Sequence, residues 1–163
     1  MADEAKFLFS AKPTWKSVLI RWLTGCRWSH VDLIDPDNED YVIGSTGKKG
    51  VHRIKMSTRL PEGATGAIVT VPNLSGKAVQ SVIEAHIGDK YDYAGLARFI
   101  FPWHDEDPNR FFCSELIAWG ILSVRPDFPV LRKLFPYEAT PADIWHAVRS
   151  ELLGEQICYV NGK

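Results

Sequence analysis

Two kinds of apolar spacing divide the chain into short strands and amphipathic helices. Alternating apolar and polar positions predict strands at 6–11, 29–34, 41–46, 51–56, 66–71 and 157–160. Helical spacing after a capping residue predicts helices beginning near Thr14, Ser75 and Thr140, and the apolar run 112–124 predicts a buried helix. Strands joined by turns and mixed with helices indicate an α+β fold, with an antiparallel sheet packed against helices.

A hairpin is predicted where the turn-rich segment 35–40 joins the second and third strands. If the hairpin folds symmetrically about this segment, Ile34 faces Tyr41 and His30 faces Ser45. A slip of one residue would move the side chains to the other face of the sheet. The symmetric pairing therefore predicts that Ser45 lies on the same face as His30.

Tryptophan spacing suggests which aromatic side chains are buried. The tryptophans at helix or strand spacing are expected in the core, and these are Trp15, Trp22, Trp28 and Trp119. Trp103 differs because it lies in the polar, proline-containing part of the segment 89–110, to which the pattern assigns no regular structure. Trp103 is therefore a candidate for a substrate contact.

The length and charge of the chain limit the classes of protein to which it can belong. The 163 residues predict a single domain, 1–163, and 45% hydrophobic with 24% charged residues is typical of a globular protein. Lys and Arg total 19 against 20 Asp and Glu, so there is no overall attraction to nucleic acid. The apolar stretches are too short to span a bilayer, and no signal peptide is visible, which predicts a cytoplasmic protein without an integral membrane segment. The sequence does not indicate an oligomeric state.

Three cysteines, Cys26, Cys113 and Cys158, show neither a disulfide framework nor the spacing of a zinc site. Cys113 stands out because it is expected in the first turn of a helix. There the free amide groups and the positive end of the helix dipole stabilise a thiolate. The consecutive polar residues 104–107 cannot all converge on one ion, so neither a metal nor another cofactor is predicted.

His30 is the candidate base for this thiol because it begins a strand, where its side chain can project past the sheet edge. A thiol nucleophile needs an imidazole within hydrogen-bond reach, and the two need not be close in sequence. A third residue should orient the imidazole by accepting a hydrogen bond from its other nitrogen. Ser45 is the candidate that the hairpin indicates, and Asp32 and His52 are alternatives.

These residues occur in segments that resemble the permuted branch of the NlpC-type papain-like cysteine peptidases, the YiiX-like proteins. The resembling segments are FLFSAKPTWKSVLIRWLTGCRWSHVDLI, GDKYDYAGL, FFCSELIAWGI and TPADIW. The resemblance implies a permuted papain-like domain in which Cys113 is the nucleophile, His30 is the base and Tyr91 lies beside the thiol as a hydrogen-bond donor to the oxyanion. Where relatives often have a larger polar residue after the histidine strand, this chain has Gly44 and Ser45.

The function expected from this resemblance is hydrolysis or acyl transfer at an amide or ester bond through an acyl-enzyme on Cys113. The substrate would be a peptide, as in bacterial cell walls, or a lipid acyl compound. The alternative is a non-catalytic module that binds a peptide or lipid on the same fold. A third reading is a structural protein in which Cys113 is only a buried side chain.

Overall fold

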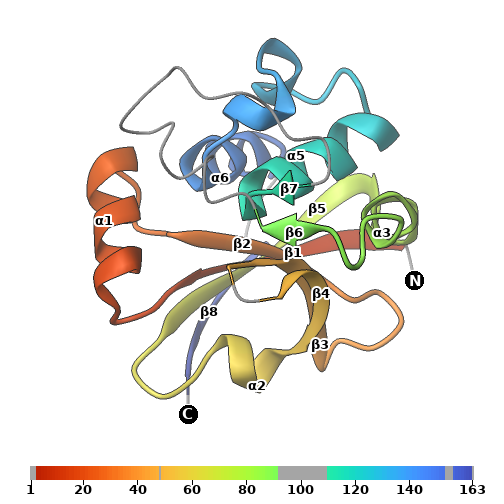
Figure 1. Cartoon of the computed structure of the whole chain (residues 1–163). Coiled ribbons are helices and arrows are strands. Elements are labelled where there is room, and N and C mark those ends of the chain that lie inside the picture. Colours follow the sequence, from red (N-terminus) through yellow and green to blue (C-terminus); the bar gives the residue numbers. More distant parts are fainter. Residues whose placement is uncertain (1–2, 48, 92–109, 153–155, 163) are drawn as a thin grey trace.

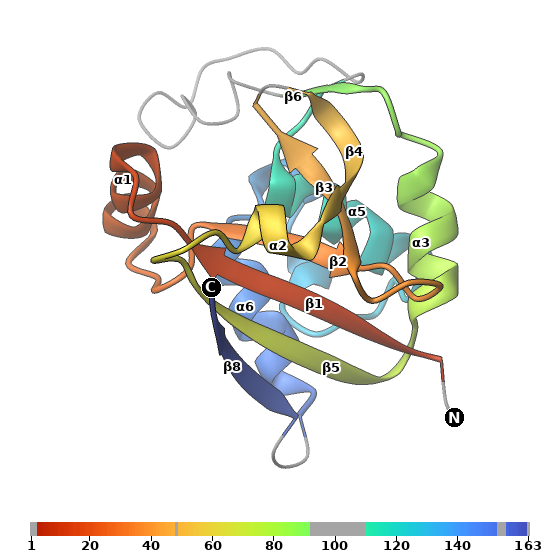
Figure 2. The ribbon, with the colours of Figure 1, turned by 90° about the horizontal axis from the view of Figure 1, so that it is seen from below.

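An antiparallel sheet forms the centre of the computed structural model, which describes residues 3–47, 49–91, 110–152 and 156–162. The described residues give six strands in the order β4-β3-β2-β1-β5-β8 (Figures 1 and 2). The strands are β1 (Glu4–Ala11), β2 (His30–Ile34), β3 (Tyr41–Thr46), β4 (Gly50–Lys55), β5 (Thr65–Ser75) and β8 (Ile157–Asn161). A separate parallel pair consists of β6 (Lys90–Tyr91) and β7 (Arg110–Phe111).

Helices lie on both sides of this sheet. In Figure 1, α5 and α6 lie above it and α2 lies below it. The α-helices are α1 (Trp15–Thr24), α2 (Met56–Arg59), α3 (Gly76–Glu84), α5 (Cys113–Val124) and α6 (Pro141–Ser150), and the 3-10 turns are η1 (Leu131–Lys133) and η2 (Pro136–Glu138). The α+β class and the antiparallel sheet packed on helices are confirmed.

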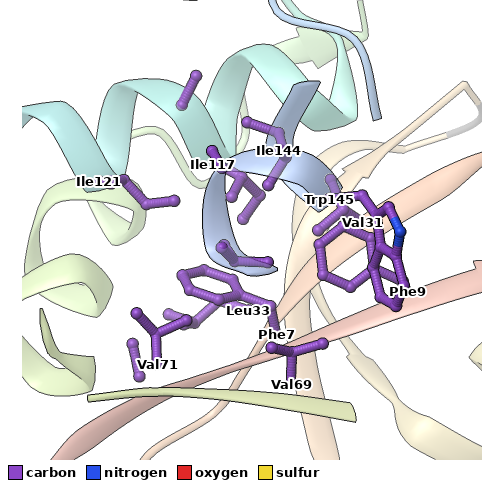
Figure 3. Packing of buried hydrophobic residues seen from close by; sticks show 14 of the residues in the cluster. Phe7, Phe9, Val31, Leu33, Val69, Val71, Ile117, Ile121, Ile144 and Trp145 are labelled. Carbon is purple, nitrogen blue, oxygen red and sulfur yellow. The ribbon is translucent and has the colours of Figure 1, made fainter. Parts of the chain in front are cut away.

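The larger core fills the space between the sheet and the two helices above it. Phe7, Phe9 and Leu33 of the sheet are buried with Ile117 of α5 and Trp145 of α6 (Figure 3). A smaller cluster of buried side chains lies on the opposite side of the sheet. It comes from strands β1 to β4 and from the residue after α2, and includes Leu8, Ile34, Val42, Ile54 and Leu60. Burial of apolar area on both faces holds the strand that carries His30 in a fixed position.

The predicted helix starts are confirmed by their caps. Thr14, Ser75 and Thr140 each precede a helix, and their hydroxyl oxygens accept hydrogen bonds from Ser17 N, Ala78 N and Asp143 N. Gly25 ends α1 in the left-handed conformation at φ 61°, which only glycine adopts without strain. Local sequence signals therefore determine where these helices begin and end.

The tryptophan prediction is wrong for three of four positions. Trp28 is fully buried, whereas Trp15, Trp22 and Trp119 are 72%, 77% and 45% exposed. The buried residues of α1 are Ser17 and Ile20, so this helix turns a narrow face to the protein and leaves its bulky side chains outside. Helical spacing identifies one face of a helix but does not show which face is covered.

The hairpin register differs from the prediction by one residue. Ile34 pairs with Val42 rather than Tyr41, and Leu33 pairs with Ile43. The cause is the turn, where Asp35 N donates to Tyr41 O at 3.0 Å and Asp37 N donates to the Asp35 side chain at 2.9 Å. Asp35 thus takes the place opposite Tyr41 that was expected for Ile34, and each pair along the hairpin is shifted by one residue.

Candidate active site

Cys113 is the first residue of α5, as the sequence predicts. The start of α5 is fixed on two sides, because the Glu115 carboxylate accepts a hydrogen bond from Phe112 N at 3.2 Å and Ser114 Oγ donates to Ala139 O at 2.6 Å. The thiol is fully buried in a small cluster with Ile20 and Phe112. The free amide groups at the start of a helix favour a negatively charged sulfur, whereas burial among apolar side chains opposes charge at the same atom.

His30 is oriented by a carboxylate two residues along its own strand. His30 Nε2 lies 2.9 Å from Asp32 Oδ1 and donates a hydrogen bond to it. The imidazole side chain is 18% exposed, whereas the Asp32 side chain is fully buried. Because Nε2 is engaged by Asp32, Nδ1 is the nitrogen left for exchanging a proton with a thiol.

Arg59, at the end of α2, holds the Asp32 carboxylate from the other side. Arg59 Nε lies 2.6 Å from Asp32 Oδ2 in an ion pair, and Nη2 donates to Oδ1 at 2.9 Å. Arg59 is buried, as is its partner. The structure thus contains a chain of contacts from Arg59 through Asp32 to His30, and no sequence pattern indicates the role of Arg59.

The charges in this chain of contacts shift two pKa values. For Asp32, burial acts to raise the pKa, but Arg59 and His30 outweigh it and the pKa is lowered, so the carboxylate stays ionised. For His30, burial and the Arg59 cation act to lower the pKa, but Asp32 and a negative charge on Cys113 outweigh them and raise it to about 9. The influence of Cys113 on His30 shows that the two side chains are within electrostatic reach of each other.

Gly44 provides the space that Asp32 occupies. A Cβ atom added at Gly44 would lie 1.8 Å from Asp32 Oδ1 and 2.9 Å from its carboxyl carbon. The register of β2 and β3, continued by one residue beyond the pair of Leu33 and Ile43, places Gly44 opposite Asp32. The absence of a larger polar residue at this position, noted in the sequence, therefore leaves room for a carboxylate from the neighbouring strand.

The structure distinguishes the three candidates for the residue that contacts His30. Asp32 makes the contact with His30, whereas His52 Nδ1 lies 2.9 Å from the carbonyl of Gly50 in its own strand. The symmetric pairing from which Ser45 was expected to face His30 is wrong, because Ile34 pairs with Val42; the same register extended along the strands would place Thr46 opposite His30. Ser45 is buried and lines the same pocket as His30.

Of Tyr91 and Trp103, the structure describes the backbone of Tyr91 alone. The backbone of Tyr91 pairs with Phe111, two residues before Cys113. This pairing brings the Tyr91 backbone close to the start of α5. Trp103 and the polar residues 104–107 lie outside the described residues.

A pocket of about 300 Å³ opens beside His30. It lies between the end of β1, the start of α1, the end of β3 and Arg59 of α2. The residues that line it include Lys12, Lys16 and Arg59, together with hydroxyl side chains at 10, 14, 17, 29, 45 and 46. The imidazole therefore borders a polar space large enough for a small substrate group.

Comparison with known proteins identifies the fold. The crystal structure of the metalloprotein YiiX from Escherichia coli O157:H7 matches with a TM-score of 0.64, over 99% of this chain and 98% of that chain. The chain has a YiiX-like fold. The sequence identity is 16%, so the match establishes the fold and leaves activity open. No protein-family model matches the sequence, and no curated protein matches it.

The description of YiiX as a metalloprotein raises the question of a metal at the site described here. Among residues 3–47, 49–91, 110–152 and 156–162, no group of three or more His, Cys, Asp or Glu side chains is arranged to hold a metal ion. The Asp32 carboxylate is already shared by His30 and the Arg59 cation, and a cation at this distance repels a metal. The described donors therefore do not fit a metal ion.

No helix in the described part of the chain is long and apolar enough to cross a membrane.

Proposed function

We propose that the protein is a thiol hydrolase or acyltransferase of the permuted papain-like, NlpC type, which acts on an amide or ester bond through an acyl-enzyme on Cys113. The observation that carries the proposal is the contact chain from Arg59 through Asp32 to His30, with Cys113 in electrostatic reach of the imidazole. A structural histidine needs no buried carboxylate held by a buried arginine. A general base that must become an imidazolium benefits from both.

The first chemical step is attack by sulfur on the substrate carbonyl. His30 Nδ1 takes the proton of the Cys113 thiol, and the raised pKa of His30, about 9, favours the resulting imidazolium. The sulfur forms a bond to the carbonyl carbon, and the carbonyl electrons move onto oxygen. When the tetrahedral intermediate collapses, the leaving amine or alcohol accepts the proton from His30 and a thioester on Cys113 remains.

The second step releases the acyl group. His30, neutral again, takes a proton from water or from another acceptor as that acceptor attacks the thioester, and the proton returns to the Cys113 sulfur as it leaves. The backbone N–H of Cys113 at the start of α5 is a suitable donor to the oxyanion. Tyr91 is the proposed second donor, which the pairing of its backbone with Phe111 supports.

Acylation by p-nitrophenyl acetate tests the proposal directly. We expect a burst of p-nitrophenol and an acetyl group on the peptide that contains Cys113, found by mass spectrometry. Cys158→Ala, which removes an exposed thiol, should leave the burst unchanged, whereas Cys113→Ala should abolish it. Acetylation of Cys158 alone would contradict the proposal.

The role of His30 is tested by the pH dependence of iodoacetamide labelling, because burial slows Cys113 at every pH but does not alter the shape of the profile. An ion pair between imidazolium and thiolate predicts that Cys113 labels below about pH 7 in the parent and loses this acidic reactivity in His30→Gln. Identical profiles in the parent and His30→Gln would show that the imidazole does not activate the thiol.

A binding module on the same fold is the second candidate, and the complete burial of Cys113 favours it. In this case the pocket beside His30 would hold a peptide or lipid group without covalent chemistry. Absence of acylation together with saturable binding in the pocket would support this candidate.

A further inference from the structure

The pocket beside His30 is lined by basic side chains and lacks an acidic one. Lys12, Lys16, His30 and Arg59 contribute to its wall, and no Asp or Glu does so among the described residues. Asp32 lies behind the wall and is engaged by His30 and Arg59. The charge of Asp32 therefore offsets one of these cations, and the two lysines add positive charge that no carboxylate in the wall offsets.

Lys12 is the cation best placed to hold a ligand. It is half-buried, and within the described part of the chain its ammonium group makes one weak contact, a hydrogen bond to Thr58 O at 3.5 Å. Burial is the largest cause that lowers the pKa of Lys12, and the Arg59 cation lowers it further, while Asp32 acts in the opposite direction. A bound anion would relieve both unfavourable effects.

Ser10 supplies an independent indication that the pocket binds a hydrogen-bond acceptor. Its side chain is 1% exposed, it lines the pocket, and its Oγ has no hydrogen-bond partner in the described residues. Its neighbours are satisfied, since Ser17 Oγ and Ser29 Oγ lie 2.6 Å apart and Lys12 N donates to Ser17 Oγ at 3.1 Å. A buried hydroxyl without a partner is unfavourable, and an oxyanion in the pocket would accept a hydrogen bond from it.

The position of Ser10 connects the pocket to the candidate active site. Ser10 pairs with His30 across β1 and β2, so a group bound by Ser10 lies next to the imidazole. The pocket wall has one apolar side chain of any size, Ile20, against several hydroxyl groups. This lining suits a small charged group better than an acyl chain.

We propose that this pocket binds an oxyanion of the substrate, a carboxylate or phosphate group, with Lys12 supplying the charge and Ser10 donating a hydrogen bond. That the anion belongs to the substrate rests on the proposed function, whereas the binding of the anion does not. The substrate class is then an acyl compound with an anionic group close to the bond that is cleaved. Lys16, at the exposed rim, attracts the anion toward the pocket.

Anion binding is tested by thermal unfolding in sodium acetate, sodium phosphate or sodium chloride at equal ionic strength. We expect acetate or phosphate to raise the Tm of the parent by a few degrees in a saturable manner relative to chloride. Lys12→Met and Ser10→Ala should lose most of this shift, Lys12→Arg should retain it, and Lys133→Met, which removes an exposed lysine outside the pocket, should behave as the parent does. A shift with acetate alone indicates a carboxylate, and a shift with phosphate alone indicates a phosphoryl group.

Two outcomes overturn the binding of the anion, and a third overturns its assignment to the substrate. The pocket does not bind oxyanions if neither salt shifts the Tm more than chloride does, or if Lys12→Met and Ser10→Ala keep the full shift. The shift is also measured in Cys113→Ala, so that anion binding is seen even where acylation of Cys113 fails. If the anion binds but does not slow acetylation of Cys113 by p-nitrophenyl acetate at least fivefold at saturation, the site is separate from the reaction and the substrate part of the proposal is wrong.

Discussion

Removal of the Asp32 charge is the perturbation that the structure constrains most closely. In Asp32→Asn the side chain keeps its shape, but Arg59, with a side chain 7% exposed, loses the only carboxylate that it contacts among the described residues. Breaking a buried ion pair by neutralising one partner costs about 3–5 kcal/mol, because the remaining charge stays buried without compensation. The free energy of unfolding of a native protein is about 5–15 kcal/mol, so the variant should still fold but with a much smaller free energy of unfolding.

The double variant separates the charge effect from lost packing. Arg59→Met alone should also destabilise the fold, since it leaves Asp32 buried with His30 as its remaining partner. Asp32→Asn combined with Arg59→Met removes both charges and should cost less than the sum of the single changes, with a coupling of about 2 kcal/mol. Urea unfolding followed by tryptophan fluorescence gives these free energies, provided that the m-value is unchanged.

The same variants report on His30. Without the Asp32 charge, burial and Arg59 both continue to lower the pKa of His30, so it should fall from about 9, which an NMR titration of the imidazole protons would detect. The matched control is Glu39→Gln, which removes a carboxylate from the exposed ion pair with Lys6 and should cost less than about 1 kcal/mol. Additive single effects, or an unchanged titration of His30 in Asp32→Asn, would refute the assigned contact chain.

Three further outcomes follow from the described contacts. Gly44→Ala should destabilise the fold by roughly 1–3 kcal/mol and reduce acylation, because the added Cβ would lie 1.8 Å from Asp32 Oδ1; parental stability and rate would contradict this. Ser114→Ala should cost about 1 kcal/mol in urea unfolding, through loss of the hydrogen bond to Ala139 O. The folded pKa of His30, about 9, lies above its ordinary 6.5. The contribution of His30 to the free energy of unfolding is therefore complete below about pH 6.5, and roughly 3 kcal/mol of it is lost as the pH rises through 9. His30→Gln should flatten that part of the plot of stability against pH, and parallel plots for the parent and the variant would contradict this prediction.

The sequence predicts those parts of the site that depend on local signals. Cys113 at a helix start and His30 at a strand start follow from capping and alternation, which act over a few neighbouring residues. The helix caps at Thr14, Ser75 and Thr140 were predicted for the same reason.

The parts that depend on long-range packing were not predictable. The hairpin register is set by the hydrogen bonds of Asp35 within a turn whose conformation the sequence does not specify uniquely. Arg59 reaches Asp32 across 27 positions of sequence, and a single arginine in a short polar segment has no pattern that indicates burial. Trp15 and Trp22 have core spacing but lie on a helix that turns another face to the protein.

Asp32 and Gly44 should be understood as one structural unit. A carboxylate at 32 reaches the imidazole from the same strand, and it does so only because position 44 has no side chain. A side chain at position 44 would occupy the space of the Asp32 carboxylate, so the two cannot be accommodated together. The carboxylate that contacts His30 thus comes from the strand of His30 itself, and Arg59 keeps it charged at that buried position.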